Sequence, residues 1–215
     1  GDAMQILAYK CLEKYESKIQ KKLIQIFNDT ALKICEGQQL DIEFEKEKDI
    51  QFSDYIQMIK YKTAVLLGSS LKMGGIINNI SDSDLGLLYD IGLNLGLAFQ
   101  IQDDYLDLFG DEKLIGKKIG GDLINRKKTV MYHVYKELSS SEDSQFLDQI
   151  YNNSEIEDDI KIEKITTLFK EGQVDIKTKN LSQEYSNKAI SLIEKLNIKN
   201  DKKTDLLVIC KKLLS

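Results

Sequence analysis

The 215-residue chain contains no proline. Proline lacks a backbone N–H and clashes with the preceding turn, so it interrupts helix interiors. Its absence, together with apolar residues that recur every three or four positions, favours an all-α fold. A chain of this length is also large enough to bury a substantial core. We therefore expect residues 1–215 to form a single domain that is helical almost throughout.

Charge and cysteine content argue against several classes of protein. Thirty basic and thirty-five acidic residues give a net charge of −5, so we expect no general affinity for nucleic acid or anionic lipid. The three cysteines form no C-x-x-C pair, so neither a disulfide framework nor a zinc cluster is predicted. No apolar run reaches the roughly 18 residues of a membrane span. The expected location is the cytoplasm.

Apolar periodicity and glycine positions predict where helices begin and end. The first three expected helices span residues 2–44 (as one helix or two), about 54–73 and about 82–109. Ser53 offers an N-cap for the second of these helices, and Gly74-Gly75 is expected to end it. Acidic and basic residues alternate over 43–49, which predicts a solvated connection between the first and second of these helices. Further amphipathic helices are expected from Met131 onward, with breaks at 139–144, 152–154, 172 and 197–201.

The helix predicted over 82–109 carries two different stripes. The apolar stripe consists of Leu88, Ile91, Leu95 and Ala98. The second stripe consists of Gly92, Gly96, Gln100, Asp103 and Asp107. Glycine inside a helix costs about 1 kcal/mol relative to alanine, so two glycines need a reason, such as a close neighbouring helix or a ligand. A pocket lined by this face would explain both its glycine half and its acidic half.

The aspartates of the second stripe suit a divalent cation. Asp103 and Asp107 lie four positions apart, and like charges at that spacing repel each other unless a cation relieves the repulsion. Magnesium typically takes one or two carboxylates together with substrate phosphates, and Asp104 can support such a site. A solvated acidic turn is the alternative. The apolar neighbours Phe99 and Leu108 favour the metal site, because this segment is otherwise suited to burial.

A glycine-punctuated loop over residues 110–121 follows the aspartates. Four lysines in or just after this loop can neutralise phosphate oxygens: Lys117, Lys118, Lys127 and Lys128. The single arginine, Arg126, leaves most phosphate binding to lysine. Taken alone, the lysines could be solvated surface charge. Together with the aspartates they predict a diphosphate site bridged by magnesium.

Two further sets of polar residues leave alternatives open. Along the first helical segment, the spacing of the inward-facing residues continues to Gln38 and Asp41, which would then extend a core-facing stripe. Alternatively, Gly37 weakens the helix there and both side chains are solvated. His133, the sole histidine, is expected to be packed or at the surface rather than to act as a catalytic base.

Several motifs resemble those of the trans-type isoprenyl diphosphate synthases, the family that includes farnesyl and geranylgeranyl diphosphate synthases. The motifs are Phe99-Gln-x-x-Asp-Asp-x-x-Asp107, Gly116-Lys117, Gly120-Gly121-Asp122, Lys127-Lys128-Thr129, Gly37-Gln38-x-x-Asp41 and Lys62-Thr63. They agree with the family in type, order and spacing, and weaker similarity continues from Tyr185 to Leu196. The resemblance implies an all-α orthogonal helical bundle of the isoprenoid synthase type.

The resemblance also implies a reaction and a set of site residues. An allylic diphosphate held by Mg²⁺ loses its diphosphate, isopentenyl diphosphate attacks the resulting allylic cation, and loss of a proton completes the carbon–carbon bond. The implied metal-binding residues are Asp103, Asp104 and Asp107. The implied substrate-binding residues are Gln38, Asp41, Lys117, Lys118 and Lys127. The implied catalytic residues, beside the leaving group and the developing cation, are Lys62, Thr63 and Gln100.

The sequence departs from the family pattern in what it lacks. Complete members carry an earlier aspartate-rich motif, an arginine pair and a basic motif for isopentenyl diphosphate, and none of these occurs here. We therefore expect an N-terminally truncated member, the C-terminal two-thirds of a bundle, that is inactive or nearly so alone. A homodimer or a partner chain is implied. A non-catalytic partner subunit and a terpene cyclase are the alternatives, although no N-S-E type triad follows the lysine loop. Product length cannot be read from these residues.

Overall fold

The computed structural model describes residues 2–47, 49–111, 116 and 118–214, and within them all regular structure is helical. The elements are α1 (Asp2–Leu12), α2 (Ser17–Phe44), α3 (Phe52–Ile59), the π-helix η1 (Lys60–Ala64), α4 (Val65–Ile77), α5 (Asp82–Phe109), α7 (Gly121–Ile124), α8 (Val130–Leu138), α9 (Ser141–Asn152), α10 (Asp158–Glu171), α11 (Val174–Lys195) and α12 (Asn200–Leu213). None of the described helices is both long enough and apolar enough to cross a membrane.

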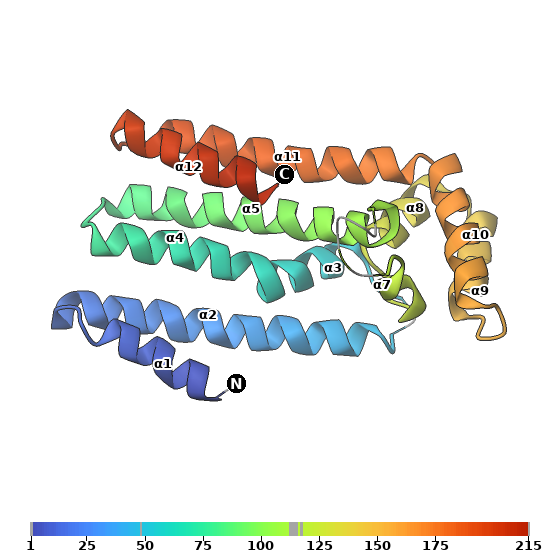
Figure 1. Ribbon diagram of the computed structural model, residues 1–215, viewed down its shortest axis with the longest axis horizontal. Coiled ribbons are helices and arrows are strands. Elements are labelled where there is room, and N and C mark those ends of the chain that lie inside the picture. Colours follow the sequence, from blue (N-terminus) through green and yellow to red (C-terminus); the bar gives the residue numbers. More distant parts are fainter. Residues whose placement is uncertain (1, 48, 112–115, 117, 215) are drawn as a thin grey trace.

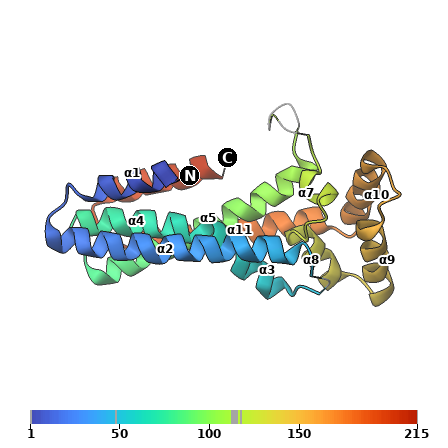
Figure 2. The ribbon, with the colours of Figure 1, turned by 90° about the horizontal axis from the view of Figure 1, so that it is seen from below.

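The long helices form a bundle that is closed at one end by helices running across it. In Figure 1, α2, α4, α5 and α11 lie along the long axis, whereas α9 and α10 run across that axis at one end. The turned view shows the same arrangement (Figure 2). Helix α5 is central and packs against α4 on one side and α11 on another. The all-α orthogonal bundle predicted from the sequence is confirmed.

Helix α5 spans the residues that the sequence predicted, and its two stripes have different neighbours. Ser81 caps it by accepting the backbone N–H of Asp84 at 3.2 Å. All four residues of the apolar stripe are buried. In the other stripe, a Cβ on Gly92 would lie 2.5 Å from the Cα of Gly68, and a Cβ on Gly96 would lie 2.4 Å from the Cα of Ala64. The two glycines are therefore explained by close helix packing rather than by a pocket.

The second predicted helix is longer than expected and contains a π-helical turn. It begins at Phe52, where Gln51 and Asp54 form a capping box, so the N-cap is Gln51 and not Ser53. It also continues past Gly74-Gly75 to Ile77, because the bare Gly75 packs against the side chains of α5. The π-helix η1 lies in its middle and contains the Lys62-Thr63 motif. Wide turns of this kind are often found at functional sites.

The helical segment expected over residues 2–44 is present as α1 and α2, and α2 continues past Gly37 to Phe44, so the alternative in which the helix ends near Gly37 is wrong. The reason is a close contact between helices: a Cβ on Gly37 would lie 2.3 Å from the backbone nitrogen of Lys62. Only glycine lets α2 approach η1 so closely. This contact sets Asp41, one turn later on α2, opposite η1.

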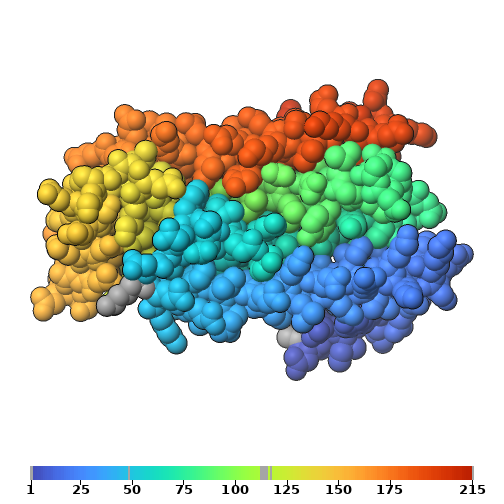
Figure 3. Space-filling view, turned by 180° about the vertical axis from the view of Figure 1, so that it is seen from behind, coloured from blue at the N-terminus to red at the C-terminus, as the bar shows by residue number. Residues whose placement is uncertain are grey.

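Seen from behind, the cyan α3 region lies between α2 and the yellow segment that includes α8 and α9 (Figure 3).

His133 on α8 is buried in an aromatic cluster, which confirms the packed alternative. Its ring centroid lies 5.4 Å from that of Tyr55, 5.4 Å from that of Tyr132 and 6.0 Å from that of Phe52. Among the described residues, its Nε2 atom finds no hydrogen-bond partner. Burial lowers the pKa of His133 to about 4, although a hydrogen bond to the backbone of Lys128 opposes this shift. The imidazole is therefore neutral at physiological pH.

The glycine packing predicts opposite outcomes for two substitutions in the same helix. Gly92→Ala should lower the free energy of unfolding by about 1–3 kcal/mol, because its Cβ must push against α4. Gly86→Ala is the control, since a Cβ there meets nothing within 4 Å. It should raise stability by about 0.5–1 kcal/mol through helix propensity alone. Urea unfolding of both variants measures this, and equal effects would contradict the packing account.

The buried imidazole predicts a loss of stability in acid. Because the pKa of His133 falls from 6.5 to about 4 on folding, only the unfolded chain gains this proton between those pH values. Stability is thus fully present above pH 6.5 and declines by about 3 kcal/mol as the pH falls to 4. In urea unfolding at pH 7, 5.5 and 4, the wild type should lose about 3 kcal/mol more stability than His133→Phe between pH 7 and pH 4. Parallel pH dependences would show that His133 is not responsible.

Candidate diphosphate and metal site

One cavity of about 270 Å³ brings most of the predicted site residues together. It lies where the end of α2, helix α3 with η1, the acidic end of α5 and the segment around residues 122–129 meet. Its polar lining consists of Asp41, Glu45, Tyr55, Lys62, Gln100, Asp103, Asp104, Asp122, Lys127, Lys128 and Thr129. Phe44, Met58 and Ile59 supply an apolar part of the wall. The cavity combines cations, carboxylates and a small apolar surface.

Lysines and aspartates alternate along one side of the cavity. Lys62 Nζ lies 2.6 Å from Asp41 Oδ2, and Lys127 Nζ lies 3.7 Å from the same oxygen. Lys127 Nζ also lies 3.5 Å from Asp122 Oδ1. Burial lowers the pKa of Lys127, but the charges of Asp41 and Asp122 outweigh burial and raise it above its usual value. Lys127 is therefore held in place as a cation at the cavity wall.

The adjacent aspartates of α5 have different environments. Asp103 is exposed and lines the cavity, so its carboxylate can be reached by a ligand. Asp104 is only 4% exposed, and burial raises its pKa to about 6, although hydrogen bonds from Tyr55 and Gln100 oppose this shift. Both of its oxygens accept hydrogen bonds from protein groups: Oδ2 from Tyr55 Oη and Val130 N, and Oδ1 from Gln100 Nε2. Asp104 thus stabilises the cavity wall through these hydrogen bonds.

Asp107 does not share the cavity with Asp103, in contrast to the expectation that both carboxylates reach one ligand. It is 5% exposed, and its Oδ2 accepts the backbone N–H of Asp122 at 3.0 Å. Its backbone carbonyl also accepts the N–H of Gly120. The physical reason is the turn into α7, which covers the last turn of α5. Asp107 therefore anchors the segment that carries Asp122 and Lys127.

The remaining predicted residues have different positions. Thr63 does not line the cavity, but its hydroxyl donates to Gln100 Oε1 at 2.9 Å and so belongs to the wall. Gln38 is exposed on α2, one turn before Asp41, and is not among the lining residues, so its substrate-binding role stays a prediction. Lys118 pairs with Asp159 at 2.9 Å on the exposed surface instead of reaching the cavity. Lys117 lies outside the described residues.

Asp122 and Tyr55 line this cavity, although the sequence did not assign either of them to the site. Asp122 was part of a recognised motif, Gly120-Gly121-Asp122, and that motif was the available signal. Tyr55 carried no local signal, because its partner Asp104 is 49 positions away along the chain. Lys128 lines the cavity and also donates to the backbone carbonyl of Glu47. Contacts of this kind appear only once the helices are packed.

The donor set fits magnesium better than a cation held by protein alone. Within the described ranges, no group of three or more His, Cys, Asp or Glu side chains is arranged to hold a metal ion. Magnesium does not need such a group, because it keeps several waters and binds through one or two carboxylates plus substrate phosphates. Asp103, exposed at the cavity, is a suitable carboxylate. Lys62 and Lys127, which line the same cavity, can donate to the phosphate oxygens.

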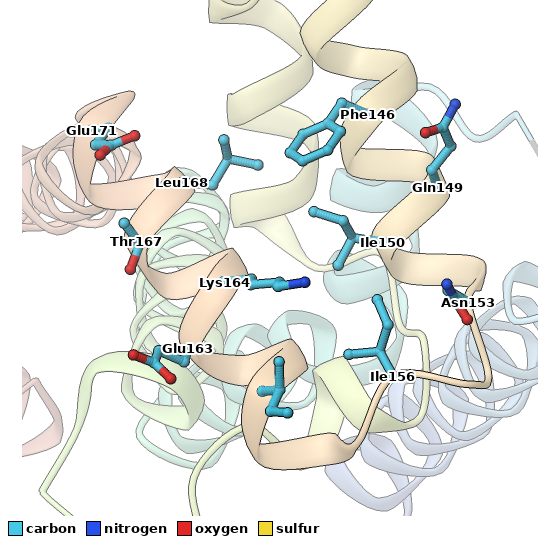
Figure 4. A pocket seen from close by; sticks show the side chains of 11 residues that line it. Phe146, Gln149, Ile150, Asn153, Ile156, Glu163, Lys164, Thr167, Leu168 and Glu171 are labelled. Atoms are coloured by element: carbon cyan, nitrogen blue, oxygen red, sulfur yellow. The ribbon is translucent and has the colours of Figure 1, made fainter.

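A larger cavity of about 660 Å³ lies elsewhere, between α9 and α10. Figure 4 shows Phe146 and Ile150 projecting from α9 toward the α10 side chains Lys164 and Leu168. Of the residues predicted to bind substrate or metal, none that the structure describes lines it. Size alone therefore does not identify the site, and the smaller cavity has the chemistry that a diphosphate requires.

Comparison with known proteins identifies the family of this chain. A family model described as polyprenyl synthetase matches residues 1–169. The geranylgeranyl diphosphate synthase of Saccharolobus solfataricus is 34% identical over 206 residues, which cover 93% of this chain and 61% of that protein. A short chain isoprenyl diphosphate synthase of Methanothermobacter thermautotrophicus is 36% identical over 156 residues, covering 72% of this chain and 48% of that protein.

Solved structures agree with the sequence matches. A crystal structure of a geranylgeranyl pyrophosphate synthase is similar with a TM-score of 0.93 at 37% identity, over 99% of this chain and 66% of that one. The geranylgeranyl pyrophosphate synthetase from Pyrococcus horikoshii gives a TM-score of 0.86 at 29% identity, over 97% and 63% of the two chains. The chain thus spans about half to two thirds of the length of these proteins. It belongs to the polyprenyl synthetase family.

Proposed function

We propose that this chain forms the lysine and aspartate wall of a magnesium-dependent prenyltransferase site. The enzyme would condense an allylic diphosphate with isopentenyl diphosphate to make a longer isoprenyl diphosphate. The observation that carries the proposal is the cavity in which Asp103 lies with Lys62 and Lys127. Relatives named as geranylgeranyl and short chain isoprenyl diphosphate synthases support it. Family membership favours this reaction over that of a terpene cyclase.

The proposed reaction needs a leaving group to be stabilised and a cation to be protected. The allylic C–O bond breaks and its electron pair leaves with the diphosphate, which Lys62 and Lys127 would hold through charge-assisted hydrogen bonds. The double bond of isopentenyl diphosphate then attacks the allylic carbon and leaves a new carbocation. A proton passes from the adjacent carbon to the released diphosphate, and the electron pair of that C–H bond forms the new double bond. Gln100 and Thr63, fixed by their mutual hydrogen bond, would direct their dipoles toward the developing charge.

Magnesium would be held at this wall by Asp103, with Asp104 and Asp107 in support. When bound, the metal supplies positive charge that neutralises the diphosphate oxygens. Asp41 and Asp122 keep the lysines in position before substrate arrives. Lys117 remains a predicted diphosphate ligand. Lys118 would have to leave Asp159 to reach the substrate.

The second proposal concerns the assembled enzyme. The relatives are longer than this chain, so the whole reaction is proposed for a protein with further residues or a partner chain. A heteromer in which this chain is the partner subunit would supply such residues. For a protein that carries the further residues in the same chain, we propose a homodimer. Co-purification with a chain that bears a further aspartate-rich motif would favour the heteromer. We also propose a cytoplasmic location.

Magnesium-dependent diphosphate binding tests the proposed wall. Titration calorimetry with inorganic pyrophosphate and Mg²⁺ should show binding to the wild-type chain that Asp103→Asn weakens by roughly tenfold or more, because a direct or water-mediated metal ligand is lost. Asp90→Asn is the matched control, since Asp90 is an exposed aspartate on the same helix. It should bind as the wild type does. Equal binding by Asp103→Asn would contradict the metal assignment.

Elongation activity tests the expectation that residues 1–215 are inactive, or nearly so, on their own. A polypeptide of residues 1–215, given an allylic diphosphate, isopentenyl diphosphate and Mg²⁺, should yield little or no longer product, because it contains only one of the two aspartate-rich motifs expected of complete members. Product analysis by mass spectrometry measures this. Rapid turnover by the polypeptide alone would show that a second acidic wall is unnecessary.

A further inference from the structure

We propose that Tyr55 is a positioning residue that, through Asp104, fixes the side-chain amide of Gln100 and with it the hydroxyl of Thr63 at the cavity. The inference deepens the proposed function, and its consequence for ligand binding rests on that function. Tyr55 lies on α3, whereas Asp104 and Gln100 lie on α5 and Thr63 on η1. The proposal therefore links three elements that enclose the diphosphate cavity.

A continuous chain of hydrogen bonds carries the proposal. Tyr55 Oη donates to Asp104 Oδ2, which also accepts the N–H of Val130 at 3.3 Å. Asp104 Oδ1 accepts from Gln100 Nε2 at 3.0 Å. Gln100 Oε1 in turn accepts from Thr63 Oγ1 at 2.9 Å. Each side chain in the series is held by the one before it.

The direction of the hydrogen bonds in this series determines how the Gln100 amide is oriented. A carboxylate only accepts hydrogen bonds, so Asp104 forces the Gln100 amide to present its NH₂ group inward and its oxygen toward Thr63. Without a fixed carboxylate, the amide could turn over and exchange its donor and acceptor ends. The orientation of Gln100 thus depends on Asp104 staying in place.

Tyr55 is suited to hold Asp104 because it is itself immobile. It is only 2% exposed, and its ring stacks on Phe52 with a centroid distance of 6.2 Å and an angle of 8° between the planes. The ring of His133 lies 5.4 Å away on α8. Removing only the hydroxyl leaves this ring packing intact. Tyr55→Phe therefore isolates the hydrogen bond.

The chain offers a matched control in a second buried tyrosine. Tyr132 is also 2% exposed and donates to an aspartate, Asp148, at 2.5 Å. Neither Tyr132 nor Asp148 lines the diphosphate cavity. Tyr132→Phe thus makes the same chemical change to a tyrosine–aspartate hydrogen bond away from Gln100. A merely structural loss should affect both variants alike.

The first measurement needs no ligand. In ¹H–¹⁵N spectra, the Gln100 side-chain amide, assigned by its disappearance in Gln100→Glu, should shift and broaden in Tyr55→Phe but not in Tyr132→Phe. An unchanged Gln100 signal in folded Tyr55→Phe would overturn the proposal. If Tyr55→Phe fails to fold, fluorotyrosine at position 55 keeps the ring and changes the donor strength of its hydroxyl, and an unshifted Gln100 signal would then overturn the proposal. Asp104→Asn tests the link from Asp104 to Gln100 separately. An asparagine that accepts from Tyr55 sets its NH₂ group against that of Gln100, so the Gln100 signal should move there too.

The second measurement is pyrophosphate binding with Mg²⁺. Tyr55→Phe should weaken it roughly tenfold, as expected when a side chain that orients a binding residue is removed, and Tyr132→Phe should not. Combining Tyr55→Phe with Gln100→Ala should weaken binding no further than Gln100→Ala alone. Independent, multiplying effects would show that Tyr55 does not act through Gln100. If the wild type binds no pyrophosphate, the proposed function fails, while the Gln100 signal still decides the positioning role.

Discussion

The close contact of bare backbones between helices is the constraint on which the site depends. Gly92 and Gly96 of α5 lie against Gly68 and Ala64, and Gly37 of α2 lies against the backbone of Lys62. These contacts set how α2, η1, α4 and α5 lie against one another to within the width of a methyl group, because a Cβ at any of these glycines would overlap its neighbour. This arrangement in turn places Asp41, Lys62 and Gln100 around one cavity. The site is thus a consequence of packing that begins elsewhere in the bundle.

Local sequence predicted the fold well where one physical signal dominated. The bounds of α5 followed from its periodicity, and the motifs predicted that Asp103 and the downstream Lys127 would lie at one site, where both line the same cavity. Prediction from local sequence failed where tertiary contacts overrode the local preference of a segment. Gly37 and Gly74-Gly75 suggested helix ends, yet the helix continues past them because a neighbour occupies the space left by the missing side chain of Gly37 and of Gly75.

The same distinction explains the candidate site. Spacing placed Asp103 and Asp107 on one side of α5, but it did not show that the turn into α7 would cover Asp107 and leave Asp103 open. Nor did it reveal Tyr55, whose role depends on a partner on another helix. Residue type and spacing thus identify which groups can do chemistry. Packing decides which of them meet the substrate.

The buried carboxylate of Asp104 illustrates why such a site is built from a network. Moving an ionised carboxylate out of water is costly, and burial accordingly raises its pKa to about 6. Three donors, from Tyr55, Gln100 and Val130, offset part of that cost. An apolar side chain would avoid the cost, but it could not dictate which end of the Gln100 amide faces Thr63. The unfavourable burial therefore makes sense as the means by which a fixed dipole orientation is maintained beside the cavity.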